Sequence, residues 1–281
     1  MVETRVGSSA LLRTCRSALI GGLRAAAPQV QIDDKGFVVE ATNNLIEGVR
    51  LVDFEDDLAQ GDGNELPGKF RAAHSSSALA VNSFAQFKGA LSDLYLPGSK
   101  DFSSLCFERK CPHGLAGRHS PNLDFFAEGP GGIVAIESKC LEPLTSHPAI
   151  FLPAYDAEIR DARRASTWFA QMQGLVEYPR TYRWLDAAQL VKHAFGLTHS
   201  FPDRATTLLY LYWEPANRAN HPFFAEHRAE IDRFGASIAG AAPSFISMSY
   251  PELWQRWSGV SQPQWLQTHV ARLNARYGVT I

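Results

Sequence analysis

The stretch "SPNLDFFAEGPGGIVAIESKC", residues 120–140, decides the fold of this chain. Two largely apolar runs, "NLDFFAE" and "GIVAIESKC", are joined by "GPGG", and such a glycine- and proline-rich joint predicts a β-hairpin. Charged residues are uncommon in strands, yet Asp124, Glu137 and Lys139 lie inside these two. A charge in an apolar frame is paired, bound to a metal or solvated at the end of a sheet. What these three side chains contact therefore decides the function of the hairpin.

Side chains two apart on a strand share a face, so Glu137 and Lys139 point one way and Ser138 the other. Pairing of the two strands brings Asp124 to the face of Glu137. Two carboxylates and a backbone carbonyl form an oxygen site that suits Mg²⁺, which can activate a water for phosphodiester hydrolysis. A lysine beside it can orient that water or neutralise the transition-state charge. The alternative is a salt-bridged trio at the end of a sheet, since E-x-K alone is a common pattern.

The segments around the hairpin predict helices packed on a sheet. Serine caps and helically spaced apolar residues predict a helix over residues 75–88. Residues 102–108 and the alternating stretch "ATTLLYLYWEP" are typical of strands, and "SFISMSY" is a shorter strand candidate. Further helices are expected over residues 1–30, 156–177, 185–198, 221–235 and 263–277. The pattern favours an α/β or α+β fold with a mixed central sheet flanked by helices. Residues 36–52 leave helix and strand open.

Composition limits the class of protein. The chain has 281 residues, 45% hydrophobic and 20% charged, with no linker-like segment, so we expect one domain over residues 1–281. Its core spans about 54–215, with an N-terminal helix before it and a helical and strand extension after it. The net charge of −2 gives no basic footprint of a nucleic-acid binder, although a local basic cleft is compatible with it. Without a run of 18 apolar residues we expect no membrane partner, and four scattered cysteines favour the reducing cytoplasm.

The spacing of the hairpin charges carries a family resemblance. "PNLD", followed after 12 residues by "ESK", resembles the PD-(D/E)xK signature of the restriction-endonuclease-like nuclease superfamily. Asn122 and Leu123 depart from a strict Pro-Asp pair. The stretches that resemble a bacterial branch of this superfamily span residues 61–215. The resemblance implies a helix, a three-stranded meander, a helix and a further strand. It also implies a DNA substrate and a divalent metal, Mg²⁺ or Mn²⁺ as a substitute, on Asp124 and Glu137.

Nucleases of this superfamily often use a glutamate from the first core helix to assist the metal. Glu65 in "GDGNEL" is the matching candidate here, and the alternative for it is a solvated loop or capping acid. Three other acids compete for that role: Glu55, Asp56 and Asp57. A later helix offers three polar residues for site support or DNA contact: Gln189, Lys192 and His193. Their spacing puts Gln189 within reach of either of the other two, and the alternative is a polar surface stripe.

Three functions compete for this site. The first is a Mg²⁺-dependent DNA endonuclease in which Asp124 and Glu137 hold the metal, Lys139 acts on the water and Glu65 assists. The second is a catalytically weak or inactive module on the same fold that binds nucleic acid or a partner. The third is an acid–base hydrolase acting on a sugar, which Lys139 disfavours because it would lower the pKa of Glu137. The sequence is compatible with a homodimer and does not decide the oligomeric state. We expect Lys139 to contribute little to the stability of the fold.

Overall fold

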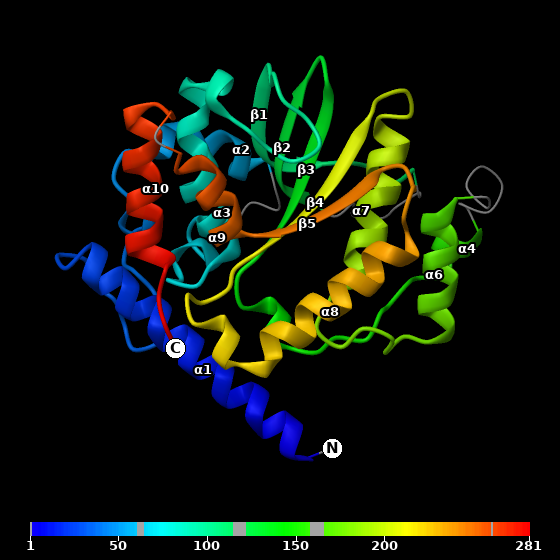
Figure 1. Ribbon diagram of the computed structural model, residues 1–281, viewed down its shortest axis with the longest axis horizontal. Helices are drawn as coiled ribbons and strands as arrows, with labels where there is room; N and C mark the ends of the chain where they lie inside the picture. The colour runs from blue at the N-terminus through cyan, green and yellow to red at the C-terminus, as the bar shows by residue number, and fades with distance from the viewer. Residues whose placement is uncertain (1, 61–64, 115–121, 158–165, 260) are drawn as a thin grey trace.

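The computed structural model describes residues 2–60, 65–114, 122–157, 166–259 and 261–281 (Figure 1). A five-stranded sheet crosses the middle of the molecule, in the order β1-β2-β3-β4-β5. Its strands are β1 (Ser104–Lys110), β2 (Asn122–Gly129), β3 (Gly132–Lys139), β4 (Thr206–Tyr212) and β5 (Ser244–Ser249). The first three form an antiparallel meander, and β4 and β5 add to it in parallel. The sheet is therefore mixed, which confirms the restriction-endonuclease-like α+β fold.

Helices cover both faces of this sheet (Figure 1). One core cluster joins the sheet to α1 (Val2–Ala26), α3 (Ser76–Phe84), α9 (Tyr250–Trp257) and α10 (Gln264–Tyr277). The other core cluster joins it to α6 (Thr167–Glu177), α7 (Ala187–Ser200) and α8 (Pro222–Ser237). Two short helices, α2 (Glu55–Ala59) and α4 (Ala154–Ala157), complete the α-helices of the described residues. None of these helices is long and apolar enough to cross a membrane.

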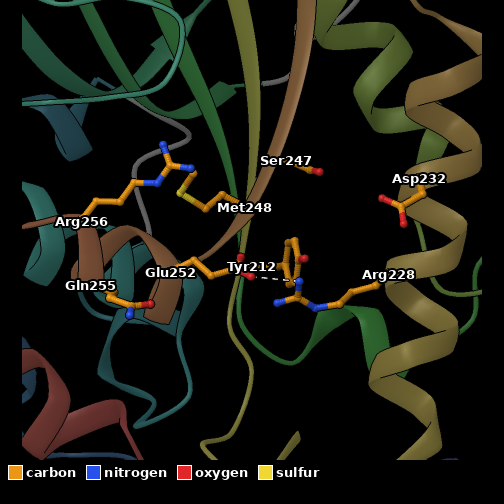
Figure 2. Close-up of a pocket in the computed structure, with 8 residues that line it drawn as sticks. All are labelled: Tyr212, Arg228, Asp232, Ser247, Met248, Glu252, Gln255 and Arg256. Atoms are coloured by element: carbon orange, nitrogen blue, oxygen red, sulfur yellow. Dashed lines mark hydrogen bonds and ion pairs between the residues drawn. The ribbon is translucent and has the colours of Figure 1, made fainter. Parts of the chain in front are cut away.

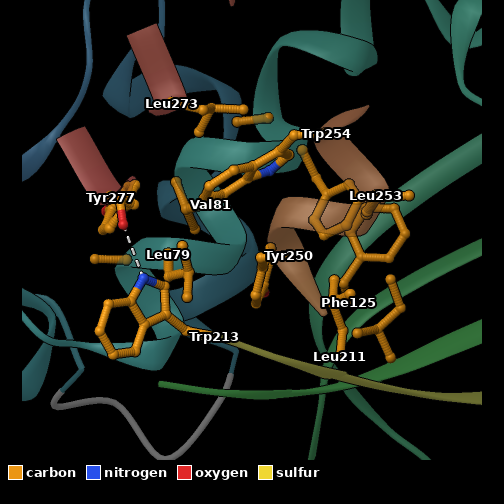
Figure 3. Close-up of a cluster of buried hydrophobic side chains, with 14 of the residues drawn as sticks. Leu79, Val81, Phe125, Leu211, Trp213, Tyr250, Leu253, Trp254, Leu273 and Tyr277 are labelled. Carbon is orange, nitrogen blue, oxygen red and sulfur yellow. Dashed lines mark hydrogen bonds between the residues drawn. The ribbon is translucent and has the colours of Figure 1, made fainter. Parts of the chain in front are cut away.

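The position of strand β4 between two layers of helices explains why its sequence is apolar almost throughout. Leu209 and Leu211 belong to the first core cluster, while Tyr210 and Tyr212 belong to the second. A strand covered by helices on both faces needs apolar residues at successive positions. The first cluster is rich in aromatic side chains (Figure 3). In it, Trp213 donates its indole N–H to the carbonyl oxygen of Tyr277 at 2.9 Å.

The hairpin forms as predicted, and it opens at the end that carries the acids. Pairing of β2 with β3 begins at Gly129↔Gly132 and stops at Phe125↔Ile136. A side chain at Gly132, which has a φ of +128°, would place its Cβ 2.7 Å from a backbone oxygen, so the turn requires glycine. Beyond Ile136, β3 continues beside β4 to Lys139↔Tyr212. The two hairpin strands therefore separate where Asp124 and Glu137 lie.

Element boundaries differ from the prediction by a few residues, as is usual for helix and strand ends. The first strand occupies 104–110 rather than 102–108, and the helix expected over 75–88 ends as α3 at Phe84, followed by a 3-10 turn. Residues 36–52 contain 3-10 turns and no long helix or strand. Residues 158–165, within the helix expected over 156–177, lie outside the described residues.

A buried arginine fixes the terminal helices to the segment that leads into α3. Arg276 on α10 is 1% exposed and donates to the carbonyl oxygen of Leu19 on α1 at 3.0 Å. It also donates to Asn44 Oδ1 at 3.1 Å and to the carbonyl oxygen of Ala73 at 2.8 Å. These acceptors bind both terminal nitrogens of the guanidinium, whereas its Nε has no hydrogen-bond partner in the described residues, and they tie Arg276 to the chain that leads into α3.

Candidate active site

A pocket of about 430 Å³ opens where β2 and β3 separate. Asp124, Glu137, Lys139 and Glu65, the four residues predicted to be catalytic, all line it, as does Gln189. Among the described residues, five carboxylates line it: Glu65, Glu108, Asp124, Glu137 and Glu142. Two lysines face them, Lys69 and Lys139. The pocket is thus strongly acidic, which suits a cation.

Asp124 is anchored to the neighbouring strand. Its Oδ2 accepts the backbone N–H of Ser138 at 2.6 Å, in the place where a strand-to-strand bond would otherwise form. Burial raises the pKa of Asp124 well above its ordinary value, and the charges of Glu137 and Glu108 raise it further. A divalent cation in this pocket would offset both effects and favour the ionised carboxylate.

Glu137 is buried and ionised. Its Oε1 lies 2.5 Å from Lys139 Nζ, and its Oε2 lies 2.7 Å from Nε2 of the fully buried His193. Burial alone would raise the pKa of Glu137, but Lys139 and His193 outweigh it and lower the pKa to about 2. The His193 contact has the distance of an ion pair without the angles of a hydrogen bond, so Oε2 is a buried oxygen with no hydrogen-bond donor among the described residues. Such an oxygen fits a metal ligand.

Lys139 is held in its charged form. Burial would lower its pKa, but Glu137, Glu142 and Asp124 raise it above the ordinary value. Its Nζ also donates to Gln189 Oε1 at 2.7 Å. Gln189 lies in the first turn of α7, where its backbone N–H donates to Oδ1 of the N-cap residue Asp186 at 3.0 Å. The sequence predicted that Gln189 would contact Lys192 or His193, and it contacts Lys139 instead. As an ammonium, Lys139 can orient a water or neutralise an oxyanion, but it cannot take up a proton.

The other predicted residues lie in different surroundings. Lys192 is not among the residues that line the described pocket; its Nζ lies over the rings of Phe151 and Tyr155. Burial lowers the pKa of Lys192. Of the competing acids, Asp57 accepts the backbone N–H of Phe107 at 3.1 Å and pairs with Lys88 at 2.6 Å. Glu65 is the one of the four candidate acids that lines the pocket.

The sequence missed Glu108, which lines the pocket from β1. Its backbone has a φ of +50°, a left-handed conformation that is uncommon for residues other than glycine. Asn122 donates to its Oε2 at 3.1 Å, and so connects β1 to β2 beside Asp124. Backbone strain of this kind concentrates at functional sites. No sequence signal marks it, because glutamate carries no preference for that conformation.

The donor set fits a hard divalent cation with an open coordination shell. Carboxylate oxygens are the ligands that Mg²⁺ prefers, and Mg²⁺ usually keeps several waters. Among the described residues, no three side chains of His, Cys, Asp or Glu already stand as a complete metal site. A cation at Asp124 and Glu137 would therefore be completed by water, a backbone carbonyl and substrate.

A second pocket, of about 520 Å³, lies between α8 and α9 beside the ends of β4 and β5 (Figure 2). It holds none of the predicted site residues. Arg228 is one of its lining residues and pairs with Glu214 at 2.5 Å and with Glu252 at 3.0 Å. Because this arginine is already paired with two carboxylates, this pocket is the weaker candidate for a catalytic centre.

Comparison with known proteins identifies one family. The family model described as Restriction Endonuclease associating with ARP matches residues 24–278, almost the whole chain. No curated protein and no solved structure matches the chain. The matched range contains every residue that lines the acidic pocket.

Proposed function

We propose that this chain, which belongs to the family Restriction Endonuclease associating with ARP, is a metal-dependent DNA endonuclease that hydrolyses phosphodiester bonds in its acidic pocket. One observation carries the proposal. Asp124, Glu137 and Lys139 line the same pocket at the point where β2 and β3 separate. The family supports a nuclease acting on DNA, and the carboxylates support the metal.

Five of the residues that line the pocket have a role in this proposal. Asp124 and Glu137 would hold Mg²⁺ or Mn²⁺, and Glu65, which lines the same pocket, would assist. The cation would supply an activated water and stabilise the charge that builds up on the phosphate. Lys139, kept charged by Glu137, would neutralise the transition-state oxygen. Gln189 would orient the lysine through its 2.7 Å hydrogen bond.

His193 supports the site from helix α7. It is fully buried on α7, and its ring lies against Glu137 Oε2 at 2.7 Å. We therefore assign His193 to positioning Glu137 and not to contact with DNA.

Nicking of supercoiled plasmid tests the function. We expect the wild type to nick the plasmid with Mg²⁺ or Mn²⁺ and to stop when EDTA removes the cation. Asp124→Asn should lose the activity while unfolding at a similar temperature, because the amide oxygen still accepts from Ser138. Glu55→Gln, a matched change of an acid that does not line the pocket, should keep it. A folded wild type that binds DNA without nicking it would instead support the non-cleaving binding module.

A further inference from the structure

The N-terminus of α3 opens into the acidic pocket and presents unused donors there. Ser75 caps the helix by accepting the backbone N–H of Ala78 at 3.1 Å. Ser76 and Ser77, the first two helical residues, line the pocket, and their backbone N–H groups have no acceptor in the described part of the chain. The first N–H groups of a helix carry the positive end of its dipole. This end of α3 therefore favours an anion.

Ser77 gives a second and independent indication of a ligand. Its side chain lines the pocket although the residue is only 8% exposed. Within the described residues its hydroxyl makes no hydrogen bond. Ser77 Oγ is not one of the solvent-inaccessible polar atoms without a partner in the described residues, and the residue lines the pocket. A ligand in the pocket would supply the hydrogen-bond partner that a mostly buried hydroxyl normally has.

Lys69 adds charge to the same wall. It is exposed, lines the pocket and forms no ion pair with any described residue. Two N–H groups, a hydroxyl and an ammonium are all donors, so the group they fit is an anion rich in acceptor oxygens. The two proposed metal-binding acids, Asp124 and Glu137, lie on strands β2 and β3.

The start of α3 is fixed relative to the catalytic strand. Ser138 donates its hydroxyl to the carbonyl oxygen of Ser76 at 3.1 Å, while its backbone N–H donates to Asp124. Ser138 lies between Glu137 and Lys139, so one residue connects the donor wall with the acidic wall. A ligand on α3 and a reacting group at the acids would therefore be neighbours.

We propose that the α3 N-terminus, with the Ser77 hydroxyl and Lys69, is a phosphate-binding subsite for the phosphate group next to the one that reacts. This inference rests on the proposed function, because it assigns substrate chemistry to the same pocket. The subsite holds the strand so that the neighbouring phosphate lies at Asp124 and Glu137. Its ligand is a nucleic-acid phosphate, either an internal phosphodiester or a terminal monophosphate.

Three variants separate the subsite from the fold. Ser77→Ala removes the hydroxyl and favours the helix, because alanine has the higher helix propensity. Ser76→Pro removes one N–H at the first helical position, where proline is tolerated, and Ser75 already has the extended backbone that precedes a proline (φ −70°, ψ 128°). Ser83→Ala is the matched control, since Ser83 is buried on the same helix and does not line the pocket.

Inorganic phosphate is the first probe, measured as a shift of the unfolding temperature in the presence of Mg²⁺. Phosphate should raise this temperature for the wild type and for Ser83→Ala. The rise should disappear in Ser77→Ala and in Ser76→Pro. No rise in the wild type beyond that given by matched chloride, or an equal rise in all four proteins, would overturn the subsite.

DNA binding in Ca²⁺ is the second probe, with intact DNA verified on a gel. The ligands are a 5′-phosphorylated duplex, the same duplex with 5′-hydroxyl ends and a closed minicircle. Ser77→Ala should raise the dissociation constant about tenfold, as expected for a lost hydrogen bond to a charged group. An equal rise on all three DNAs assigns an internal phosphodiester, and a rise confined to the phosphorylated duplex assigns a terminal phosphate. If Ser77→Ala raises the dissociation constant for none of these DNAs, the subsite is overturned even if the wild type cleaves. If Ser77→Ala does raise it but the wild type never cleaves DNA, the nuclease alone is overturned.

Discussion

Replacing Lys139 with methionine tests how the buried charges of the site depend on one another. Methionine keeps the apolar length of the side chain and removes the ammonium that lies 2.5 Å from Glu137. The Glu137 side chain is 3% exposed, so the variant leaves a buried carboxylate whose remaining close neighbour is His193 at 2.7 Å. Breaking a buried pair by removing one partner costs about 3–5 kcal/mol, and we expect a loss of that size in the free energy of unfolding.

The loss should depend on pH with a definite sign. In the wild type the pKa of Glu137 is lowered to about 2, so its contribution to stability is present above its unfolded pKa and is lost as pH falls toward 2. Without the lysine, burial dominates and raises that pKa. Protonation then relieves the buried charge, so Lys139→Met should be less destabilised at about pH 5 than at about pH 8.

Urea unfolding in EDTA at the two pH values measures this loss, and a Mg²⁺ titration follows it. A divalent cation would replace the missing positive charge, so Mg²⁺ should stabilise Lys139→Met more than it stabilises the wild type. Nicking should still fall about a hundredfold in the Mg²⁺-stabilised variant, because the cation does not replace a positioned catalytic ammonium.

Lys192→Met is the matched control for this variant. Lys192 lies over aromatic rings, 5.3 Å from the Phe151 centroid, and is not paired with Glu137. Its loss should cost only about 0.5–1 kcal/mol and should not alter the response to Mg²⁺. If Lys139→Met loses no more stability than Lys192→Met, with the same pH dependence, the coupling between Lys139 and Glu137 is refuted.

Three further predictions concern stability and metal affinity. Gly174 on α6 has open space for a Cβ, so Gly174→Ala should stabilise the protein by about 0.5–1 kcal/mol in thermal unfolding. Gly196→Ala should destabilise it, because the new Cβ would lie 2.4 Å from the Cys111 carbonyl oxygen. A Gly196→Ala variant as stable as the wild type would contradict this packing. Burial lowers the pKa of His227 to about 3, so the wild type should lose stability as pH falls below the unfolded value of about 6.5, by about 2 kcal/mol at about pH 5 from this residue. His227→Gln should lack that part of the acid loss, and an unchanged pH profile would show that the histidine is not held neutral. Glu65→Gln should weaken Mg²⁺ binding severalfold in calorimetry with little change in unfolding temperature, and unchanged affinity would remove Glu65 from the metal site.

Local sequence signals predicted the elements that form the site. The glycine-rich joint fixed the hairpin, and the two-residue period of β3 placed Glu137 and Lys139 on one face and Ser138 on the other. The serines before residue 78 indicated where α3 begins, and Ser75 does cap it. These signals are local because a turn and a helix cap depend on a few neighbouring residues.

The tertiary features of the site could not be predicted in this way. Helical spacing put Gln189 near Lys192, but spacing alone does not decide which face of α7 meets the charged end of β3. The left-handed backbone of Glu108 depends on the strands around it. The expectation that Lys139 contributes little to folding is at odds with its buried ion pair with Glu137. The burial of this end of β3 depends on how α7, which carries His193, packs against it, and the sequence alone does not give that packing.

The most direct test of the central claim measures metal binding and cleavage in one titration. Mn²⁺ binding is followed by electron paramagnetic resonance, and plasmid nicking is measured at the same free Mn²⁺ concentrations, for the wild type, Asp124→Asn and Glu55→Gln. We expect that the Mn²⁺ concentration that half-saturates binding also half-activates nicking in the wild type and in Glu55→Gln, and that Asp124→Asn loses both together. Mn²⁺ binding that persists unchanged in Asp124→Asn, or nicking that proceeds without any divalent cation, would contradict it.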